Sequence, residues 1–211
     1  MLNVAVLVSG GGTNLQALID AQARGEIRNG KIALVVSGNP KAYALERAAK
    51  AGIPSRVLVR KHFAAQQEYD RALLALLAEY RTDLVVLAGF LTIVSDEVVA
   101  RYPNRMMNIH PSLIPSFCGA GYYGIRVHEE ALKRGVKVTG ATVHFVNEVC
   151  DGGPIILQKA VEVLPDDTPE TLQRRVMEQA EWKLLPRAVS LFCEGRLSVK
   201  DGKVTIQEER K

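Results

Sequence analysis

Asn108 and His110 are residues whose types and spacing could do chemistry. They stand in the segment Met-Met-Asn-Ile-His-Pro-Ser-Leu-Ile-Pro at residues 106–115. A neutral amide donor beside a titratable imidazole can stabilise an oxyanion and manage a proton during acyl or formyl transfer. The same pattern is also typical of a strand end with a capping Asn and a half-buried His, because Asn and Pro are ordinary turn residues.

A carboxylate in a second segment adds to this pair. Asp151 follows a run of β-branched and aromatic residues and precedes Gly152 and Gly153. The glycines let the carboxylate approach another loop closely, since neither presents a side chain. An Asp-Gly turn between two strands is the plain structural alternative. On the predicted strand that precedes Asp151, Thr142 and His144 are spaced to face one side and could hold the candidate catalytic residues in position.

A glycine loop near the start of the chain could bind an anion. It contains three glycines followed by two polar residues, namely Gly10, Gly11, Gly12, Thr13 and Asn14. The loop joins a predicted strand to a predicted helix, the place where a doubly wound sheet presents backbone amides to phosphate. It lacks the dinucleotide fingerprint, because Leu15 stands where that pattern has Gly or Ala. Alone, a glycine loop is weak evidence for phosphate.

An apolar stretch follows the fourth predicted strand, where a polar loop would be expected. It consists of Phe90, Leu91, Thr92, Ile93 and Val94. At the carboxyl end of a strand, such a turn could support a flat ligand. It could equally be a buried hinge that packs on the helix predicted at residues 96–101.

The elements that must position these residues alternate between strands and helices. Predicted strands cover residues 2–8, 31–37, 56–59, 84–88, 106–109, 138–146 and 155–163. Predicted helices cover residues 15–23, 42–51, 67–80, 96–101 and about 169–192, the last with Thr168 as its cap. This alternation predicts an α/β fold with an open, mostly parallel, doubly wound sheet covered on both faces. The long C-terminal helix should be followed by a β-hairpin at residues 197–206.

Length, charge and cysteine content narrow the class of protein. With 211 residues, of which 47% are hydrophobic, the chain can bury one substantial core, so a single domain is expected. Its net charge of +4 has no dense basic block, which favours anionic small molecules over nucleic acid. The three cysteines lack CxxC spacing, so neither a disulfide framework nor a metal site is expected. No signal peptide or membrane span is visible, and a cytoplasmic location is expected.

Three blocks of the sequence together resemble a known family. They are Val-Ser-Gly-Gly-Gly-Thr-Asn-Leu-Gln, Asn-Ile-His-Pro-Ser-Leu-Ile-Pro, and Gly-Ala-Thr-Val-His-Phe-Val followed by Asp-Gly-Gly-Pro-Ile-Ile. In this order they resemble the phosphoribosylglycinamide formyltransferases of purine biosynthesis, over essentially the whole chain. The resemblance implies one Rossmann-like formyltransferase domain at residues 1–211. Its phosphoribosyl-binding half is expected at about 1–100, and its catalytic and folate-binding half at about 101–211.

The resemblance also implies an activity. The formyl group of 10-formyltetrahydrofolate would pass to the amine of 5-phosphoribosylglycinamide, which gives the N-formyl product and tetrahydrofolate. Asn108 and the imidazolium of His110 would donate hydrogen bonds to the tetrahedral oxyanion. Asp151 would lie within direct or one-water reach of His110, stabilise the imidazolium and hold its pKa up.

Further residues match the family's binding segments. The phosphoribosyl substrate is expected at Gly11, Gly12, Thr13, Asn14 and Glu181. The folate is expected on the apolar turn at residues 90–94, with Gln66 near its tail. Gln66 and Thr92 stand where the family commonly has Arg, and Trp182 stands where His is frequent. A glycine-rich loop at residues 116–127 could be a flap over the substrates or purely structural.

Two related activities and one noncatalytic function are alternatives. A 10-formyltetrahydrofolate hydrolase and a transfer-RNA formyltransferase use the same Asn, His and Asp set. The resemblance implies that they carry additional domains, for which 211 residues leave no room. A noncatalytic nucleotide-binding module would explain the fold and the glycine loop, but not the three catalytic residue types together. The chain is expected to act on small molecules, as a monomer or a homodimer.

Overall fold

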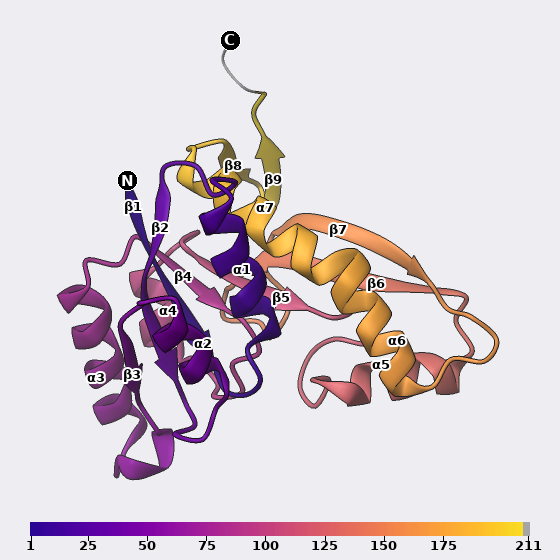
Figure 1. Cartoon of the computed structure of the whole chain (residues 1–211), viewed down its shortest axis with the longest axis horizontal. Coiled ribbons are helices and arrows are strands. Elements are labelled where there is room, and N and C mark those ends of the chain that lie inside the picture. The colour runs from indigo at the N-terminus through magenta and orange to yellow at the C-terminus, as the bar shows by residue number, and fades with distance from the viewer. Residues whose placement is uncertain (209–211) are drawn as a thin grey trace.

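A seven-stranded sheet forms the centre of the protein (Figure 1). The structure is a computed structural model and describes residues 1–208. The strands lie in the order β3-β2-β1-β4-β5-β6-β7. They are β1 (Leu2–Val8), β2 (Gly30–Ser37), β3 (Ser55–Val57), β4 (Leu84–Leu87), β5 (Met106–His110), β6 (Val138–Phe145) and β7 (Ile155–Glu162). The last three residues of the expected 1–211 domain lie outside the described part of the chain.

Strands β1 to β5 run parallel, and β6 is antiparallel to both of its neighbours, β5 and β7. The predicted open, mostly parallel, doubly wound sheet is therefore confirmed. The chain continues from β1 to β2 and β3 on one side, and then returns to place β4 on the other side of β1. The loops after β1 and β4 thus flank the crevice in which open α/β sheets bind ligands.

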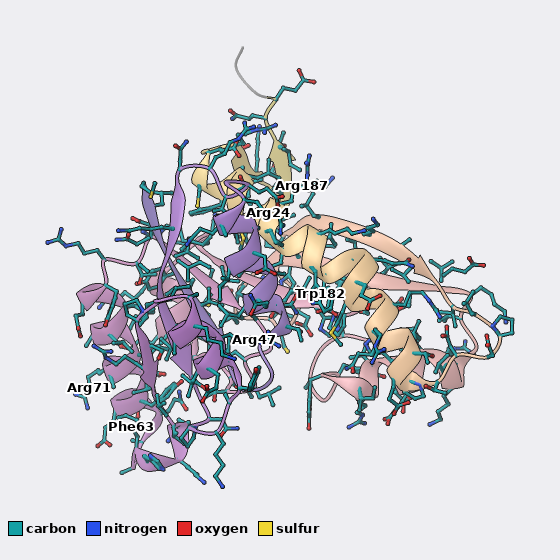
Figure 2. The ribbon with its side chains drawn as sticks, in the orientation of Figure 1. Arg24, Arg47, Phe63, Arg71, Trp182 and Arg187 are labelled. Carbon is teal, nitrogen blue, oxygen red and sulfur yellow. The ribbon has the colours of Figure 1, made fainter. Side chains whose placement is uncertain are left out.

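Helices cover both faces of the sheet because its central strands are apolar on both sides. They are α1 (Thr13–Ala23), α2 (Ala44–Lys50), α3 (Gln66–Glu79), α4 (Asp96–Arg101), α5 (Ile125–Arg134), α6 (Pro169–Val176) and α7 (Trp182–Cys193), with a short 3-10 turn, η1 (Arg60–His62). Along β1, Val4, Val6 and Val8 join the core on the face of α1 and α7, whereas Ala5 and Leu7 join the core with α3 and α4. Side chains of α2, including Arg47, lie near the start of α1 (Figure 2).

The C-terminal helical segment is interrupted by one π-helical turn. Thr168 caps α6 by accepting the backbone N–H of Thr171, and Pro169 is the first helical residue, as predicted. The π turn, η2 (Met177–Glu181), then leads directly into α7. Strands β8 (Leu197–Lys200) and β9 (Lys203–Ile206) form the predicted terminal hairpin.

Two local predictions are wrong. The glycine-rich loop predicted at residues 116–127 ends earlier, because α5 begins at Ile125 and buries Val127, His128 and Ala131 on one face. The strand predicted at residues 106–109 was expected to end before His110. His110 is instead the last residue of β5 and is 4% exposed, because β6 extends far enough to pair with it.

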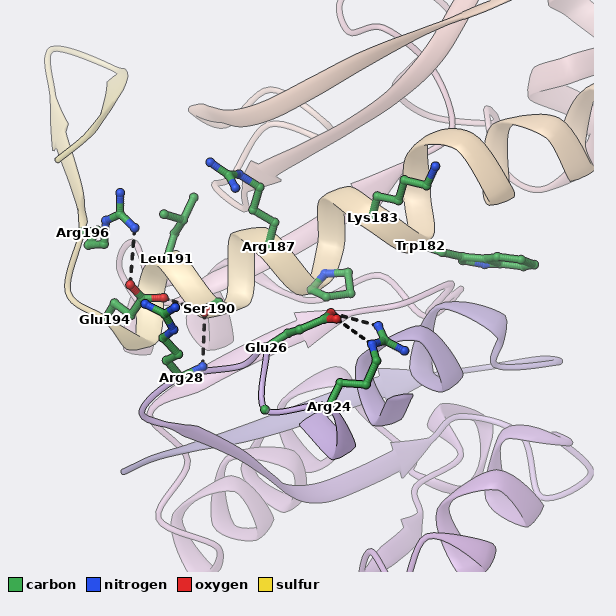
Figure 3. A pocket seen from close by; sticks show the side chains of 12 residues that line it. Arg24, Glu26, Arg28, Trp182, Lys183, Arg187, Ser190, Leu191, Glu194 and Arg196 are labelled. Carbon is green, nitrogen blue, oxygen red and sulfur yellow. Dashed lines mark hydrogen bonds and ion pairs between the residues drawn. The ribbon is translucent and has the colours of Figure 1, made fainter. Parts of the chain in front are cut away.

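A surface cavity of about 510 Å³ lies between the turn after α1 and the outer face of α7 (Figure 3). Two ion pairs line it, Arg24 with Glu26 at 2.6 Å and Arg196 with Glu194 at 3.4 Å. Trp182 also contributes to its wall, but none of the expected site residues does. The candidate site must therefore be located from the side chains at the carboxyl ends of the strands.

Candidate active site

Strands β5 and β6 bring four expected side chains to one face of the sheet. In their antiparallel register Asn108 lies opposite His144, and His110 lies opposite Thr142. Residues two apart on a strand share a face, so all four side chains project to the same side. The predicted common orientation of Thr142 and His144 is confirmed.

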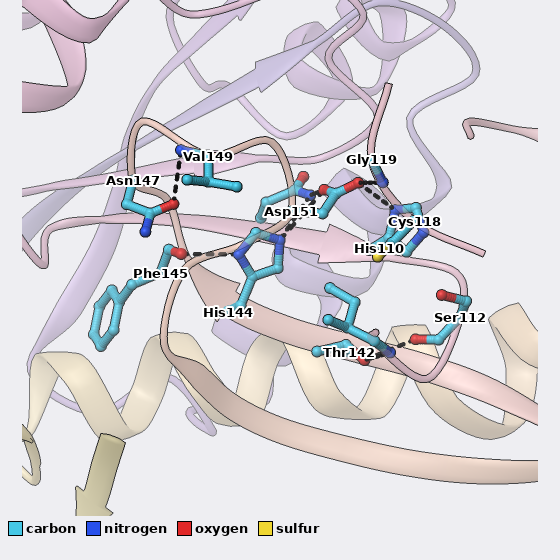
Figure 4. Close-up of polar contacts among 12 residues, drawn as sticks. His110, Ser112, Cys118, Gly119, Thr142, His144, Phe145, Asn147, Val149 and Asp151 are labelled. Atoms are coloured by element: carbon cyan, nitrogen blue, oxygen red, sulfur yellow. Dashed lines mark hydrogen bonds and ion pairs between the residues drawn. The ribbon is translucent and has the colours of Figure 1, made fainter. Parts of the chain in front are cut away.

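Asp151 reaches this cluster from the loop after β6 (Figure 4). Its Oδ2 lies 3.5 Å from Nδ1 of His110, and its Oδ1 lies 3.5 Å from Nε2 of His144. Asn108 Nδ2 donates to Oδ1 at 3.3 Å, and the backbone N–H of Gly119 donates to Oδ2 at 2.8 Å. The structure thus brings Asn108, His110 and Asp151 together, with Asp151 in direct reach of the imidazole.

The two glycines after Asp151 are required by close packing. A Cβ at Gly153 would lie 1.8 Å from the carbonyl oxygen of Phe145, and one at Gly152 would lie 2.5 Å from the side chain of Val149. Asp151 itself has a φ of 53°, in the left-handed region. This tight turn brings the loop back over the end of β6, which holds the carboxylate above His110.

The backbone of β6 fixes one hydrogen of His144. Its Nδ1 lies 2.8 Å from the carbonyl oxygen of Phe145, which only accepts, so Nδ1 carries a hydrogen. Nε2 of His144 lies 3.2 Å from the amide Nδ2 of Asn108 and 3.5 Å from Oδ1 of Asp151. Nδ2 of Asn108 thus donates to Asp151 and contacts His144.

His110 stands between two acceptors. Its Nε2 donates to the carbonyl oxygen of Phe117 at 2.8 Å, and its Nδ1 faces Asp151, so the imidazolium would satisfy both contacts. Burial nevertheless lowers the pKa of His110 from its ordinary value, although Asp151 and the Phe117 carbonyl raise it. The expectation that Asp151 raises the pKa of His110 is thus correct. The expectation that this pKa is held up is wrong for the net value, because burial lowers it by more than Asp151 raises it.

Opposing effects also act on Asp151. Burial acts to raise the pKa of its carboxyl, but the contacts with His144 and His110 and the N–H of Gly119 together hold that pKa below its ordinary value. Asp151 is therefore a carboxylate over the physiological range of pH. A fixed negative charge thus faces the imidazole whether or not His110 is protonated.

Both expected oxyanion donors already have partners. Nε2 of His110 donates to the carbonyl oxygen of Phe117, and the amide of Asn108 donates to Asp151 and contacts His144. Phe117 has a φ of 50°, a left-handed conformation that is unfavourable for a bulky residue. A substrate oxygen would have to replace one of these acceptors.

Thr142 acts on the backbone of the turn that follows His110. Its Oγ1 donates to the carbonyl oxygen of Ser112 at 2.7 Å and accepts the N–H of Ile114 at 3.1 Å. Gln158 is paired with Thr142 on β7, and its Nε2 donates to Thr142 Oγ1 at 2.9 Å. Gln158 was missed from the sequence, and its place opposite Thr142 in a paired strand is the signal that could have indicated it.

The glycine loop joins β1 to α1 beside the crevice. Gly12 is the N-cap residue of α1 with a φ of +71°, and no side chain caps the helix, so its first amides are open to a ligand. A Cβ at Gly12 would lie 2.6 Å from that of Ala44, so packing on α2 requires this glycine. A Cβ at Gly11 would meet nothing within 4 Å. Of the two positions, Gly11 is the one left open for a ligand.

The π turn brings Glu181 to the start of α1. Asn14 Nδ2 donates to Glu181 Oε2 at 2.6 Å, and Thr13 Oγ1 donates to Met177 Sδ at 3.6 Å. Burial raises the pKa of Glu181 to about 7, although the Asn14 hydrogen bond acts to lower it. Among the described residues Asn14 Oδ1 is buried without a partner. Thr13, Asn14 and Glu181, predicted to share a site, are thus adjacent, and Met177 was missed because a π turn has no sequence signal that we recognised.

The tip of the turn at residues 90–94 is apolar and exposed. Ile93 and Leu91 are 86% and 64% exposed, so this part of the turn is not the buried hinge of the alternative interpretation. Phe90 and Val94 pack partly against the core and anchor the turn. Ser9 Oγ accepts the N–H of Leu91 at 3.0 Å, which ties this turn to the glycine loop.

Gln66 stands apart from the other expected site residues. Arg60 Nε donates to Gln66 Oε1 at 2.6 Å, and Gln66 Nε2 donates to Asp70 Oδ1 at 2.7 Å. Its side chain makes no hydrogen bond to another expected site residue within residues 1–208. Arg60, which sequence reasoning missed, places a cation beside Gln66.

Two further classes of feature are absent from the described residues. No group of three or more His, Cys, Asp or Glu side chains within residues 1–208 could hold a metal ion. Over the same part of the chain, no helix has the length and apolar character needed to cross a membrane.

Comparison with known proteins decides the family. Residues 2–189 match the family described as "Formyl transferase". The chain belongs to this family. A phosphoribosylglycinamide formyltransferase from Haemophilus influenzae is 43% identical to it over 201 residues, which are 95% of this chain and 92% of that protein.

Solved structures of related proteins agree with this assignment. Glycinamide ribonucleotide transformylase 1 from Symbiobacterium toebii has a TM-score of 0.92 and 43% identity, and the match covers 99% of this formyl transferase and 95% of that chain. A formyltetrahydrofolate deformylase from Pseudomonas syringae has a TM-score of 0.88 at 28% identity and covers 98% of this chain and 66% of its own. The formyltransferase fold expected from the sequence is confirmed.

Proposed function

We propose that this formyl transferase transfers the formyl group of 10-formyltetrahydrofolate to the amine of 5-phosphoribosylglycinamide. The products are 5-phosphoribosyl-N-formylglycinamide and tetrahydrofolate, a step of de novo purine (IMP) biosynthesis in the cytoplasm. The observation that carries the proposal is the cluster of Asn108, His110 and Asp151 at the carboxyl end of β5. Relatives that match nearly the whole chain and are named for this reaction support it.

The three clustered residues have complementary roles in the proposed reaction. His110 donates from Nε2 to the oxyanion that forms when the amine attacks the formyl carbon, in place of the carbonyl of Phe117. Asn108 supplies the second donor by releasing one of its present partners. Asp151 stabilises the imidazolium and, through water, accepts the proton that the amine loses. That proton passes to the folate nitrogen as its bond to the formyl carbon breaks, which releases tetrahydrofolate.

The lowered pKa of His110 suits this role. Because burial disfavours the charged ring, the imidazolium is stabilised most when a negative charge develops beside it. His110 therefore binds the transition state better than the ground state, which is the condition for a faster chemical step. His144 and Thr142 position the site, His144 through Asn108 and Thr142 through the turn after His110.

The phosphoribosylglycinamide is assigned to the half of the chain at about residues 1–100, together with Glu181. The amides of Gly11, Gly12, Thr13 and Asn14 face the phosphate, as the open N-terminus of α1 favours an anion. Glu181 is buried beside Asn14, where it can accept hydrogen bonds from the ribosyl or glycinamide part.

The folate is assigned to the turn at residues 90–94 and the half of the chain at about 101–211. When bound, 10-formyltetrahydrofolate supplies the formyl group. Exposed Leu91 and Ile93 offer an apolar surface that a flat ring would cover, and Val149, 63% exposed, lies two residues before Asp151 in the loop after β6. Gln66 and the cation of Arg60 beside it suit the carboxylates of the folate tail.

One experiment separates the possible activities. The protein is incubated with 10-formyltetrahydrofolate, with and without phosphoribosylglycinamide, and tetrahydrofolate and formylated ribonucleotide are measured. We expect both products only with the acceptor. Equal tetrahydrofolate without the acceptor would identify a hydrolase, the alternative that the similarity to a deformylase makes specific. Binding of either compound without any product would contradict the proposal and favour a noncatalytic module.

A further inference from the structure

Arg47 of α2, which is labelled in Figure 2, hydrogen-bonds to the backbone of the glycine loop. Its Nε donates to the carbonyl oxygen of Gly11 at 2.8 Å, and its Nη1 donates to Oε1 of Gln16 at 2.9 Å. The guanidinium also lies 5.0 Å from the centre of the Tyr43 ring. One side chain thus joins the loop, the first turn of α1 and the start of α2.

The start of α2 is fitted to the same loop. The backbone N–H of Ala44 donates to the carbonyl oxygen of Gly10 at 3.2 Å, and Gly12 packs so closely on Ala44 that a Cβ would lie 2.6 Å away. Two successive carbonyls, of Gly10 and Gly11, are therefore held by α2, one by a backbone amide and one by Arg47.

Fixing these carbonyl groups has an electrostatic consequence for a bound anion. Three consecutive glycines leave the loop backbone free to adopt many conformations, including peptide orientations that point a carbonyl oxygen at the ligand. A carbonyl oxygen carries partial negative charge and would repel phosphate. While the carbonyl of Gly11 accepts the hydrogen bond from Arg47, it cannot turn toward a ligand, and the loop is already ordered before binding.

We propose that Arg47 is a positioning residue that preorganises the loop for the substrate phosphate. It acts through the backbone of Gly11 and does not touch the substrate. The identity of the phosphorylated substrate rests on the proposed function, whereas the effect on anion affinity does not. Its Nη2 makes no hydrogen bond to any residue that the structure describes, so the fork formed by Nε and Nη1 carries the effect.

Kinetics of Arg47→Lys and Arg47→Gln test the proposal. Lys keeps the charge but cannot form the fork, so we expect both variants to raise KM for phosphoribosylglycinamide about tenfold, as for loss of a charged hydrogen bond. kcat and KM for the folate should change less than about twofold, because only ground-state binding of one substrate is affected. The matched control is Lys50→Gln, which removes the same charge from the same helix, where Lys50 also lies over Tyr43. The control should leave all three constants unchanged.

A direct binding measurement separates this proposal from the proposed function. Calorimetric titration with ribose 5-phosphate should show about tenfold weaker binding to Arg47→Lys than to wild type, whatever reaction the enzyme catalyses. If wild type binds ribose 5-phosphate but does not transfer formyl, the proposed function fails and this comparison still stands. Equal affinities of Arg47→Lys and wild type, or an equal loss in Lys50→Gln, would overturn the role of Arg47.

Gln16→Met is a second variant that keeps the test decisive if Arg47→Gln does not fold. Gln16 accepts one arm of the fork, and its other contact is with Asp20 on the same helix. We expect a smaller rise in KM for the ribonucleotide. In the double variant with Arg47→Lys, KM should rise by less than the product of the two single-variant factors, because both substitutions remove the same contact. Fully multiplicative effects would show that the two residues act separately and would contradict the proposal.

Discussion

The two ends of the crevice are built in different ways. At the glycine loop, the expected contacts are backbone amides at the open end of α1, and their geometry is fixed from outside by α2 and Arg47. At the end of β5, the expected contacts are side chains, and each donor is already bonded to another group of the protein. His110 donates to the carbonyl oxygen of Phe117, and Asn108 donates to Asp151 and contacts His144.

This difference indicates a division of labour. The glycine loop can bind its ligand without giving up hydrogen bonds within the protein, so changes there should alter affinity for the ribonucleotide. The cluster at the end of β5 must exchange hydrogen-bond partners as charge develops on the substrate, so changes there should alter turnover. Substitutions at the two ends should therefore separate into effects on KM and effects on kcat.

Asp151→Asn should have the largest effect. Removing the carboxylate should lower kcat by roughly 10² to 10³, about 3 to 4 kcal/mol, the scale for loss of one oxyanion-stabilising element. Since Asp151 raises the pKa of His110, its removal lowers that pKa further, and activity should be lost at a lower pH. Steady-state kinetics from pH 5 to 9 measure both effects, and KM should change little.

Glu148→Gln is the control for Asp151→Asn. It removes a negative charge three positions earlier in the same loop, from an exposed residue. Near wild-type turnover and an unmoved pH profile in Asp151→Asn would show that Asp151 is not at the centre of the reaction.

Glu181→Gln should reveal the cost of burying a carboxylate at the binding end. The folded pKa of Glu181 is raised to about 7 from 4.5, so the stability that protonation contributes is complete below pH 4.5 and is lost as pH rises through 7. Wild type should therefore lose about 2 to 3 kcal/mol relative to Glu181→Gln between pH 5 and pH 8. Urea unfolding of both proteins at the two pH values measures this difference.

The matched variant for this prediction is Glu178→Gln, which lies on the same π turn with an exposed side chain. It should follow wild type at both pH values. If Glu181→Gln also follows wild type, then Glu181 ionises in the folded protein as it does in water, and its burial has no energetic cost.

Gly11→Ala should separate ligand approach from loop packing. A Cβ at Gly11 meets no protein atom within 4 Å, so the variant should fold normally and raise KM for the ribonucleotide roughly 10- to 30-fold by obstructing the anion. Gly12→Ala should instead lower stability, because its Cβ would meet Ala44 and its φ is +71°. Thermal unfolding and kinetics of the two variants measure the contrast. A normal KM in folded Gly11→Ala would move the phosphate away from this loop.

Local pattern was enough to predict much of this architecture. The alternation of apolar strands and helices predicted the sheet, and the period of two predicted that Thr142 and His144 face one side of their strand. Their places opposite His110 and Asn108 come from the antiparallel register of β5 and β6. The grouping of Thr13, Asn14 and Glu181 was predicted from the family resemblance, since 167 positions separate Asn14 from Glu181.

What the sequence could not predict depends on contacts between distant segments or on backbone irregularity. Arg47 lies 36 positions from Gly11, and nothing in its own helix distinguishes it from the neighbouring Lys50. The Phe117 carbonyl contacts His110 through the backbone, so no residue type signals it. The lowered pKa of His110 depends on its depth in the folded protein, which the residue sequence alone does not report.

Ile93→Asp should have the smallest but most specific effect, at the apolar turn that completes the crevice. Ile93 is 86% exposed, so the fold does not depend on it. A carboxylate at this position would have to lose water against a flat apolar ring, so a folate analogue should bind at least about tenfold more weakly. Fluorescence titration measures this affinity, with Ile206→Asp on the terminal hairpin as a control that should bind normally.

The Ser9 hydrogen bond to Leu91 ties this turn to the glycine loop, so KM for the ribonucleotide is the second readout. An unchanged value would mean that the two substrates are held independently. A rise in both constants would mean that the turn and the loop act as one unit, and unchanged folate affinity in the folded variant would place the folate elsewhere.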